Sequence, residues 1–216
     1  LSKTKKAIIF KIIAFFMNYI SKYVNILKTL MANAQIKKLF QYGIGQGFNV
    51  IAPFIVIPYI ILKCGEENFG KSAIGLSIAF FIVVFIDFGC DILGVKDISI
   101  NRDNVDKRNY IISRVIYIKC FFTILLSIVF LIVINQVDFF YKNKELFYFS
   151  FPVFMAQIAN PLWIFQGLEK FNLFSYFSIL SKSIYILLIF YFLDQKSDYV
   201  YINLAFGLSV FIAGIV

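Results

Sequence analysis

The stretch SAIGLSIAFFIVVFIDFGCDILG, residues 72–94, decides the fold. Residues 72–86 carry no charge, and the whole stretch is long enough to cross a bilayer, which takes about 20 residues of helix. Two carboxylates, Asp87 and Asp91, stand near its end. Their four-residue spacing places both on one face of a helix. The stretch therefore predicts a membrane helix that ends near the membrane surface with two acids on the same side.

The composition extends this interpretation to the whole chain. Of 216 residues, 61% are hydrophobic and only 15% are charged, which is typical of an integral membrane protein. Histidine is absent and the three cysteines have no close pairing, so we expect no catalytic centre, no metal site and no cofactor. The net charge of +9 is explained by basic loops beside apolar spans, and we expect no nucleic-acid partner.

Long apolar runs predict an all-α integral membrane fold with about six transmembrane helices in one bundle. The predicted spans, which make up the region 40–216, are 40–62, 72–94, 115–137, 146–165, 174–193 and 200–216. The last span stops without a flanking loop and the chain begins at Leu1, so we expect a truncated sequence.

The region 1–39 differs in kind from the spans. It contains eight lysines and no acid, and its longest lysine-free apolar run is too short to cross a bilayer. A basic amphipathic helix at the membrane surface is favoured over a signal peptide, because no cleavage site of small residues closes the run.

The distribution of lysine and arginine predicts the orientation. With the N-terminus in the cytoplasm, fourteen basic residues outside the spans face inward and five face outward. Since cytoplasmic loops are enriched in basic residues, we expect a multi-pass protein with a cytoplasmic N-terminus.

Ionisable residues inside the spans are the first functional candidates, because a charge at the bilayer centre costs about 3 kcal/mol on insertion scales. Lys182, near the middle of its span, would either attract an anionic group in a hydrated cavity or pair with an acid on another helix. Lys119 and Arg114, at the start of the third span, would extend to the cytoplasmic headgroups. Asp87 and Asp91 would bind a coupling H⁺ or Na⁺, or pair with basic residues of the next loop.

Uncharged polar residues form a second class of candidates. Gln46, Asn160 and Gln166 lie in or beside spans, where they would hydrogen-bond a sugar or another helix. Trp163 is expected in the interfacial aromatic belt.

Three stretches in order resemble one family, the bacterial polysaccharide flippases of the O-antigen transporter type. GQG at 45–47, with Pro-Tyr at 58–59 and Phe-Gly at 69–70, resembles the family's first span and outer loop. DFG at 87–89, continuing to GVKDI at 94–98, resembles the end of its second span and the cytoplasmic loop. PLWIFQGLEK at 161–170 resembles its junction between spans four and five.

The resemblance implies one bundle of a two-bundle transporter, the N-terminal half, in the superfamily that also holds multidrug exporters. It implies that the substrate is an undecaprenyl-pyrophosphate-linked oligosaccharide, moved across the bacterial inner membrane during synthesis of surface polysaccharide such as the O-antigen of lipopolysaccharide. Membrane lipids, a coupling cation, and a polysaccharide polymerase with other assembly proteins are the implied partners. The basic residues Lys182, Lys119 and Arg114 would then contact the pyrophosphate.

Three alternatives stay open at this stage. A cation-coupled multidrug exporter of the same superfamily would be expected to have a more acidic cavity. A membrane polysaccharide polymerase is less favoured, because the chain has no histidine and no long extracytoplasmic loop. A non-functional fragment is the third.

Overall fold

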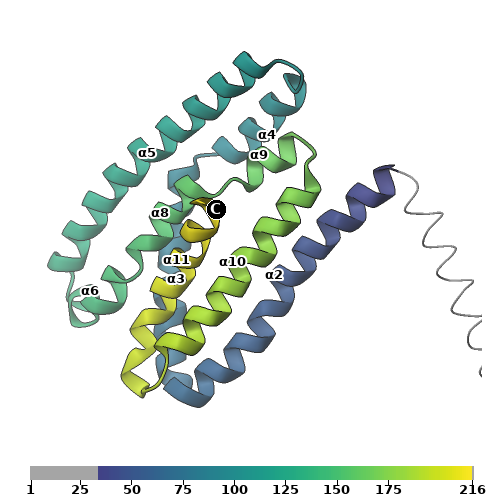
Figure 1. Cartoon of the computed structure of the whole chain (residues 1–216). Helices are drawn as coiled ribbons and strands as arrows, with labels where there is room; N and C mark the ends of the chain where they lie inside the picture. The colour runs from purple at the N-terminus through teal and green to yellow at the C-terminus, as the bar shows by residue number, and fades with distance from the viewer. Residues whose placement is uncertain (1–33, 216) are drawn as a thin grey trace, which may run out of the picture. The chain divides into compact units, whose positions relative to one another are not determined.

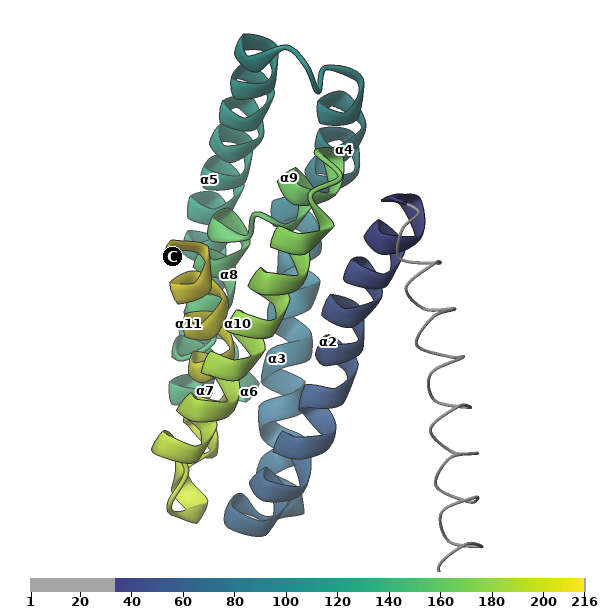
Figure 2. The same cartoon turned by 45° about the vertical axis from the view of Figure 1, so that its right-hand side comes forward.

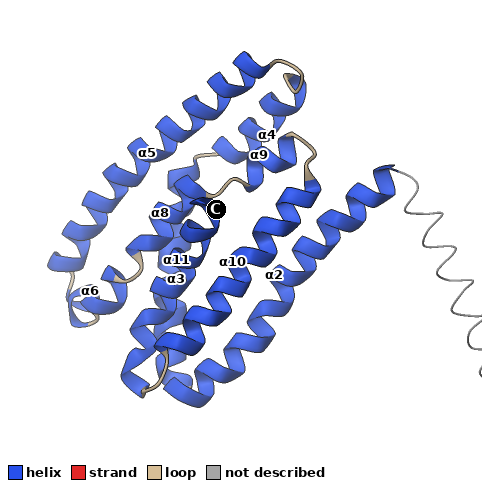
Figure 3. Ribbon diagram, viewed as in Figure 1, coloured by secondary structure: helices blue, strands red, loops and turns tan. Residues whose placement is uncertain are grey.

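The computed structural model describes residues 34–215, and these form helices joined by short turns, without a strand (Figures 1 and 3). Residues 1–33 of the predicted amphipathic helix at 1–39 lie outside the described residues. The chain divides into two compact units, Leu1–Gln41 and Tyr42–Val216.

Long helices account for most of the described chain, as the sequence predicts. They are α2 (Ala34–Cys64), α3 (Glu66–Asp87), α5 (Val105–Gln136), α10 (Phe171–Phe192) and α11 (Tyr201–Ile215), the last preceded by the 3-10 helix η1 (Lys196–Val200). Shorter helices connect them: α4 (Cys90–Ile100), α6 (Asp138–Lys142), α7 (Lys144–Tyr148), α8 (Phe151–Ala159) and α9 (Leu162–Gly167).

Five described helices are long and apolar enough to cross a membrane, where the sequence analysis expected about six. They span Gln35–Cys64, Glu66–Asp87, Val105–Gln136, Phe171–Phe192 and Lys196–Ile215. The all-α membrane fold is thus confirmed.

The prediction of one continuous span at 146–165 is wrong. Pro161 has no amide hydrogen and disfavours helical geometry at the residue before it, and Asn160 is accordingly extended, with φ −75° and ψ 107°. Its side-chain Oδ1 accepts a hydrogen bond from the amide of Leu162 at 3.2 Å, which starts α9. The region is therefore divided among α7, α8 and α9.

The predicted span at 72–94 is also interrupted. Its helix begins earlier, at Glu66, and ends at Asp87, because Phe88 and Gly89 have positive φ angles of 45° and 76°. A new helix, α4, begins at Cys90.

Apolar packing holds the helices together in three clusters. The first joins α2, α10 and α11, with Val56, Ile189 and Ile202 among its buried members. The second joins α3, α5, α7 and α8 around Phe130, Phe147 and Phe154. The third joins α4, α9 and the first half of α5, which lie together at one end of the unit (Figure 2). The two sites described next lie beside the third and the first cluster.

Candidate functional site

The first site is built on the break between α3 and α4. Asp87 is the last residue of α3 and Asp91 is the second residue of α4. The backbone amide of Asp91 donates a hydrogen bond to Oδ1 of Asp87 at 3.2 Å. The two carboxylates are therefore close, as the sequence predicts, although they flank a helix break instead of sharing one helical face.

Lys119 of α5 connects the two carboxylates. Its Nζ lies 3.3 Å from Oδ1 of Asp87 and 2.5 Å from Oδ1 of Asp91. The lysine side chain is 1% exposed, against 20% and 31% for the two aspartates. Gln157 of α8 donates from Nε2 to the other Asp91 oxygen at 3.4 Å. Two carboxylates and one ammonium leave this ion cluster one negative charge in excess when all three are ionised.

An aromatic ring covers the cluster from α9. Nζ of Lys119 lies 5.8 Å from the ring centroid of Trp163, a distance at which an ammonium is attracted to an aromatic face. Trp163 is 4% exposed and belongs to the third apolar cluster, so its expected place in an interfacial belt is wrong. It fits because α4 carries Gly94: a Cβ there would lie 2.6 Å from two ring carbons.

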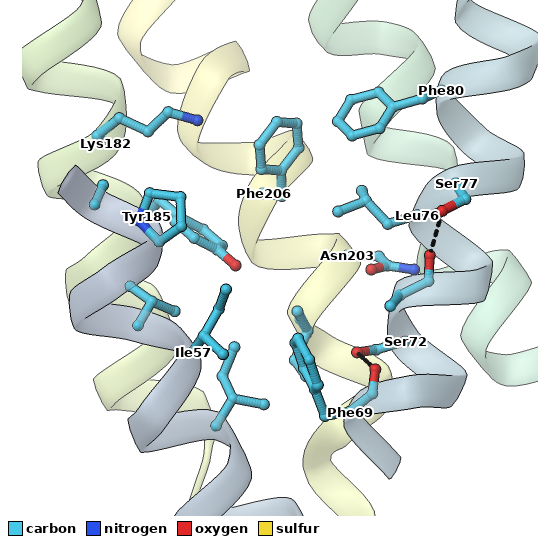
Figure 4. A pocket seen from close by; sticks show the side chains of 16 residues that line it. Ile57, Phe69, Ser72, Leu76, Ser77, Phe80, Lys182, Tyr185, Asn203 and Phe206 are labelled. Carbon is cyan, nitrogen blue, oxygen red and sulfur yellow. Dashed lines mark hydrogen bonds between the residues drawn. The ribbon is translucent and has the colours of Figure 1, made fainter. Parts of the chain in front are cut away.

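The second site is a cavity of about 340 Å³ among α2, α3, α10 and α11 (Figure 4). Its wall is mainly aliphatic and aromatic. The lining residues are Ala52, Pro53, Val56, Ile57, Ile60, Phe69, Ser72, Ala73, Leu76, Ser77, Phe80, Lys182, Tyr185, Ile202, Asn203 and Phe206.

Lys182 supplies the positive charge of the cavity wall. Its amine points toward Phe206, with Nζ 4.7 Å from the ring centroid (Figure 4). Within residues 34–215 it forms no ion pair. The sequence leaves open whether Lys182 attracts an anionic ligand or pairs with an acid on another helix. No acid partner is found among the described residues.

The other predicted site residues do not line this cavity. Arg114 pairs with Asp97 at 3.2 Å on an exposed surface. Gln46 donates to the hydroxyl of Tyr42 at 2.9 Å, and Asn160 is occupied at the start of α9. Gln166 is exposed. The structure thus brings Lys119 together with Asp87 and Asp91. Lys182 lines the cavity without any other predicted site residue.

Comparison with known proteins gives the family. A model of the family described as "Polysaccharide biosynthesis protein" matches residues 35–216. The chain belongs to this family. Within it, the chain is similar to a protein of Escherichia coli (strain K12) named "Putative O-antigen transporter", with 27% identity over 181 residues. The match covers 83% of this chain and 43% of that relative, so the chain spans less than half of its length. No solved structure matches.

Two residues that line the cavity were not predicted from the sequence as site residues. Asn203 and Tyr185 both lie in predicted spans and line the cavity. Asn203 is an uncharged polar residue in an apolar run. The same pattern made Gln46 and Asn160 candidates, and it would also have indicated Asn203 in the last predicted span. Tyr185 follows Lys182 by three residues, and that spacing places two side chains on the same side of a helix.

Proposed function

We propose that this chain is part of a flippase that moves undecaprenyl-pyrophosphate-linked oligosaccharide repeat units across the bacterial inner membrane for surface polysaccharide synthesis. Family membership and the name of the similar E. coli protein support a role in polysaccharide transport. We propose transport instead of catalysis, with a cytoplasmic N-terminus, and with a polysaccharide polymerase acting next on the product.

The observation that carries the proposal is an ammonium inside an apolar cavity with no acid among its described neighbours. Lys182 lines the cavity, and the wall around it is aliphatic and aromatic. Ionisable groups in membrane helices are costly and mark substrate pathways. An anionic lipid-linked substrate supplies the missing negative charge, whereas a cationic drug would be repelled.

The ion cluster of Asp87, Asp91 and Lys119 is the proposed coupling group. Its excess negative charge suits a proton or Na⁺. Neutralising one carboxylate changes the balance of attractions across the break between α3 and α4, since Lys119 bonds to both sides of it. In this proposal Lys119 pairs with the two carboxylates, and Lys182 binds the anionic part of the substrate.

Surface display of polysaccharide tests the function. Deletion of the gene should abolish display and cause lipid-linked repeat units to accumulate, and its full product should restore display. A product with Lys182→Ala should restore less than a tenth of it, while the exposed Lys196→Ala control should restore it fully at equal membrane abundance. Normal polysaccharide after deletion, or a change only in drug resistance, would overturn the proposal.

A further inference from the structure

The cavity around Lys182 has a composition that selects one part of a lipid-linked substrate. Such a substrate has three chemically distinct parts: a branched hydrocarbon chain, a phosphate group and a sugar. The charges, hydrogen bonds and shape of the cavity can be compared with each part in turn. This comparison rests on the proposed function for the kind of lipid, and on the described residues for the fit.

The charge of the cavity suits the phosphate. The amine of Lys182 and the ring of Phe206 face each other at 4.7 Å, and a ring face offers much weaker compensation than a full anion. The hydroxyl of Tyr185 points into the same space (Figure 4) and has no hydrogen-bond partner among the described residues. One ammonium and one free hydroxyl can together hold a phosphate.

Apart from Lys182 and Tyr185, the polar side chains of the cavity are poorly suited to a sugar, because they already form hydrogen bonds within the protein. The hydroxyl of Ser72 donates to the carbonyl of Phe69, and that of Ser77 donates to the carbonyl of Ala73, each at 2.8 Å. Asn203 is 0% exposed, and its side-chain amide group is hydrogen-bonded with Oγ of Ser150 at 2.9 Å. A sugar ring here would bury several hydroxyls without partners, which costs about 1–3 kcal/mol for each.

The wall of the cavity suits a branched hydrocarbon chain. Phe69, Phe80 and Phe206 provide flat surfaces, and branched aliphatic residues fill the space between them. The volume of about 340 Å³ is near the lower end of the range for small-ligand pockets, about 300–1,000 Å³. It therefore holds a short segment of a long chain.

The cavity is also open at its side, as a long chain requires. Phe80 and Ile57 line it and yet are 43% and 36% exposed. Because the cavity is partly open, a ligand bound inside can extend to the outside of the helix bundle. The rest of the chain and the sugar would both lie beyond the cavity.

We propose that this cavity binds the phosphate-proximal segment of an isoprenoid chain, with the phosphate at Lys182 and Tyr185 and the first isoprene units against the three phenylalanines. The sugar remains outside it. The site is thus a recognition site for the lipid carrier, separate from any site that contacts sugar.

Binding of farnesyl phosphate to the purified full protein in detergent tests this site. Farnesol and inorganic pyrophosphate separate the contributions of chain and phosphate, and dioleoyl phosphatidic acid represents a straight-chain lipid phosphate. We expect farnesyl phosphate to bind at least tenfold more tightly than each of these three. Equal binding of pyrophosphate would reduce the site to an anion site, and equal binding of phosphatidic acid would remove the preference for isoprenoids; either result overturns the proposal.

Two variants locate the binding. Lys182→Gln should weaken farnesyl phosphate at least tenfold and leave farnesol unchanged, with Lys196→Gln as the matched control. Ala73→Leu, which places a larger side chain in the cavity wall, should weaken both ligands, with Ile74→Phe on the exposed side of α3 as its control. Unchanged binding in both cavity variants would place the ligand elsewhere. If farnesyl phosphate binds in the cavity but polysaccharide display stays normal after gene deletion, the proposed function is overturned and the proposed site is not. If display is lost after deletion but farnesyl phosphate does not bind in the cavity, the proposed site is overturned and the proposed function is not.

Discussion

The ammonium of Lys119 reaches from α5 to Asp91 of α4, where Nζ and Oδ1 are 2.5 Å apart. The same nitrogen contacts Asp87, which belongs to the preceding helix. One buried side chain thus bonds to both sides of the interruption between α3 and α4. Its removal would leave two neighbouring carboxylates without their cation.

We expect Lys119→Met to destabilise the protein strongly. Breaking a buried ion pair by removing one partner costs about 3–5 kcal/mol, because the other charge stays buried and uncompensated. Thermal unfolding in detergent should show a large decrease in the midpoint. Lys170→Met, at an exposed lysine, is the control, and a triple variant that adds Asp87→Asn and Asp91→Asn should recover part of the loss. A midpoint equal to that of the wild type in Lys119→Met would contradict this account.

Neutralising one acid of the ion cluster should affect transport more than folding. In Asp91→Asn the lysine keeps Asp87 as a partner, so the unfolding midpoint should change little. If the excess negative charge binds the coupling cation, display of polysaccharide should decrease at least tenfold and lose its dependence on the ion gradient. The exposed Asp138→Asn serves as the matched control. Gradient-dependent display in the Asp91 variant would remove the cluster from the coupling mechanism.

Gly94→Ala should be destabilising because of a steric clash. The added methyl would lie 2.6 Å from carbons Cε3 and Cζ3 of the Trp163 ring, and overpacking of this kind costs about 1–3 kcal/mol. Gly70→Ala is the control, since a Cβ there meets nothing within 4 Å and alanine favours helix over glycine by about 0.5–1 kcal/mol. Combining Gly94→Ala with Trp163→Leu should make the glycine substitution less costly than it is alone, as a double-mutant cycle of unfolding free energies would measure. Additive effects would argue against the contact.

Gly89→Ala should be destabilising for a different reason. A Cβ at Gly89 would meet nothing within 4 Å, but the residue has φ +76°, a left-handed conformation that costs other residues about 1–2 kcal/mol. Gly89→Asn should be milder than Gly89→Ala, because asparagine tolerates this conformation better. Unfolding midpoints of the two variants measure the difference, and equal midpoints would show that backbone conformation at the break contributes little.

The sequence predicted the class of fold, because this depends on composition and on the length of the apolar runs. It did not predict where helices break. Gly89 and Pro161 are ordinary signals of interruption, but a long apolar run outweighed them in the assignment of the spans at 72–94 and 146–165.

The partners of the charged residues could not be predicted in the same way. Lys119 and Asp91 are 28 residues apart, and whether a buried lysine meets an acid or extends to the headgroups depends on how α5 packs against α4. The residues that surround Lys182 come from three other helices. Spacing along the sequence does not show which residues of those helices face Lys182, or that none of them is an acid. Gln46 and Asn160 resembled ligand-binding groups, but bonds to their own helix or turn occupy them.

The hydroxyls of Ser72 and Ser77, bonded to carbonyls within their own helix, have a consequence for specificity. Apart from Lys182 and Tyr185, the polar groups of this wall already form hydrogen bonds, so the wall has few groups with which to distinguish one sugar from another. Under the proposed arrangement, repeat units of different composition would be equivalent to this half of the pathway as long as they share a carrier. A change in polysaccharide structure would then require no change in these residues, and selection for new sugars would act on other surfaces.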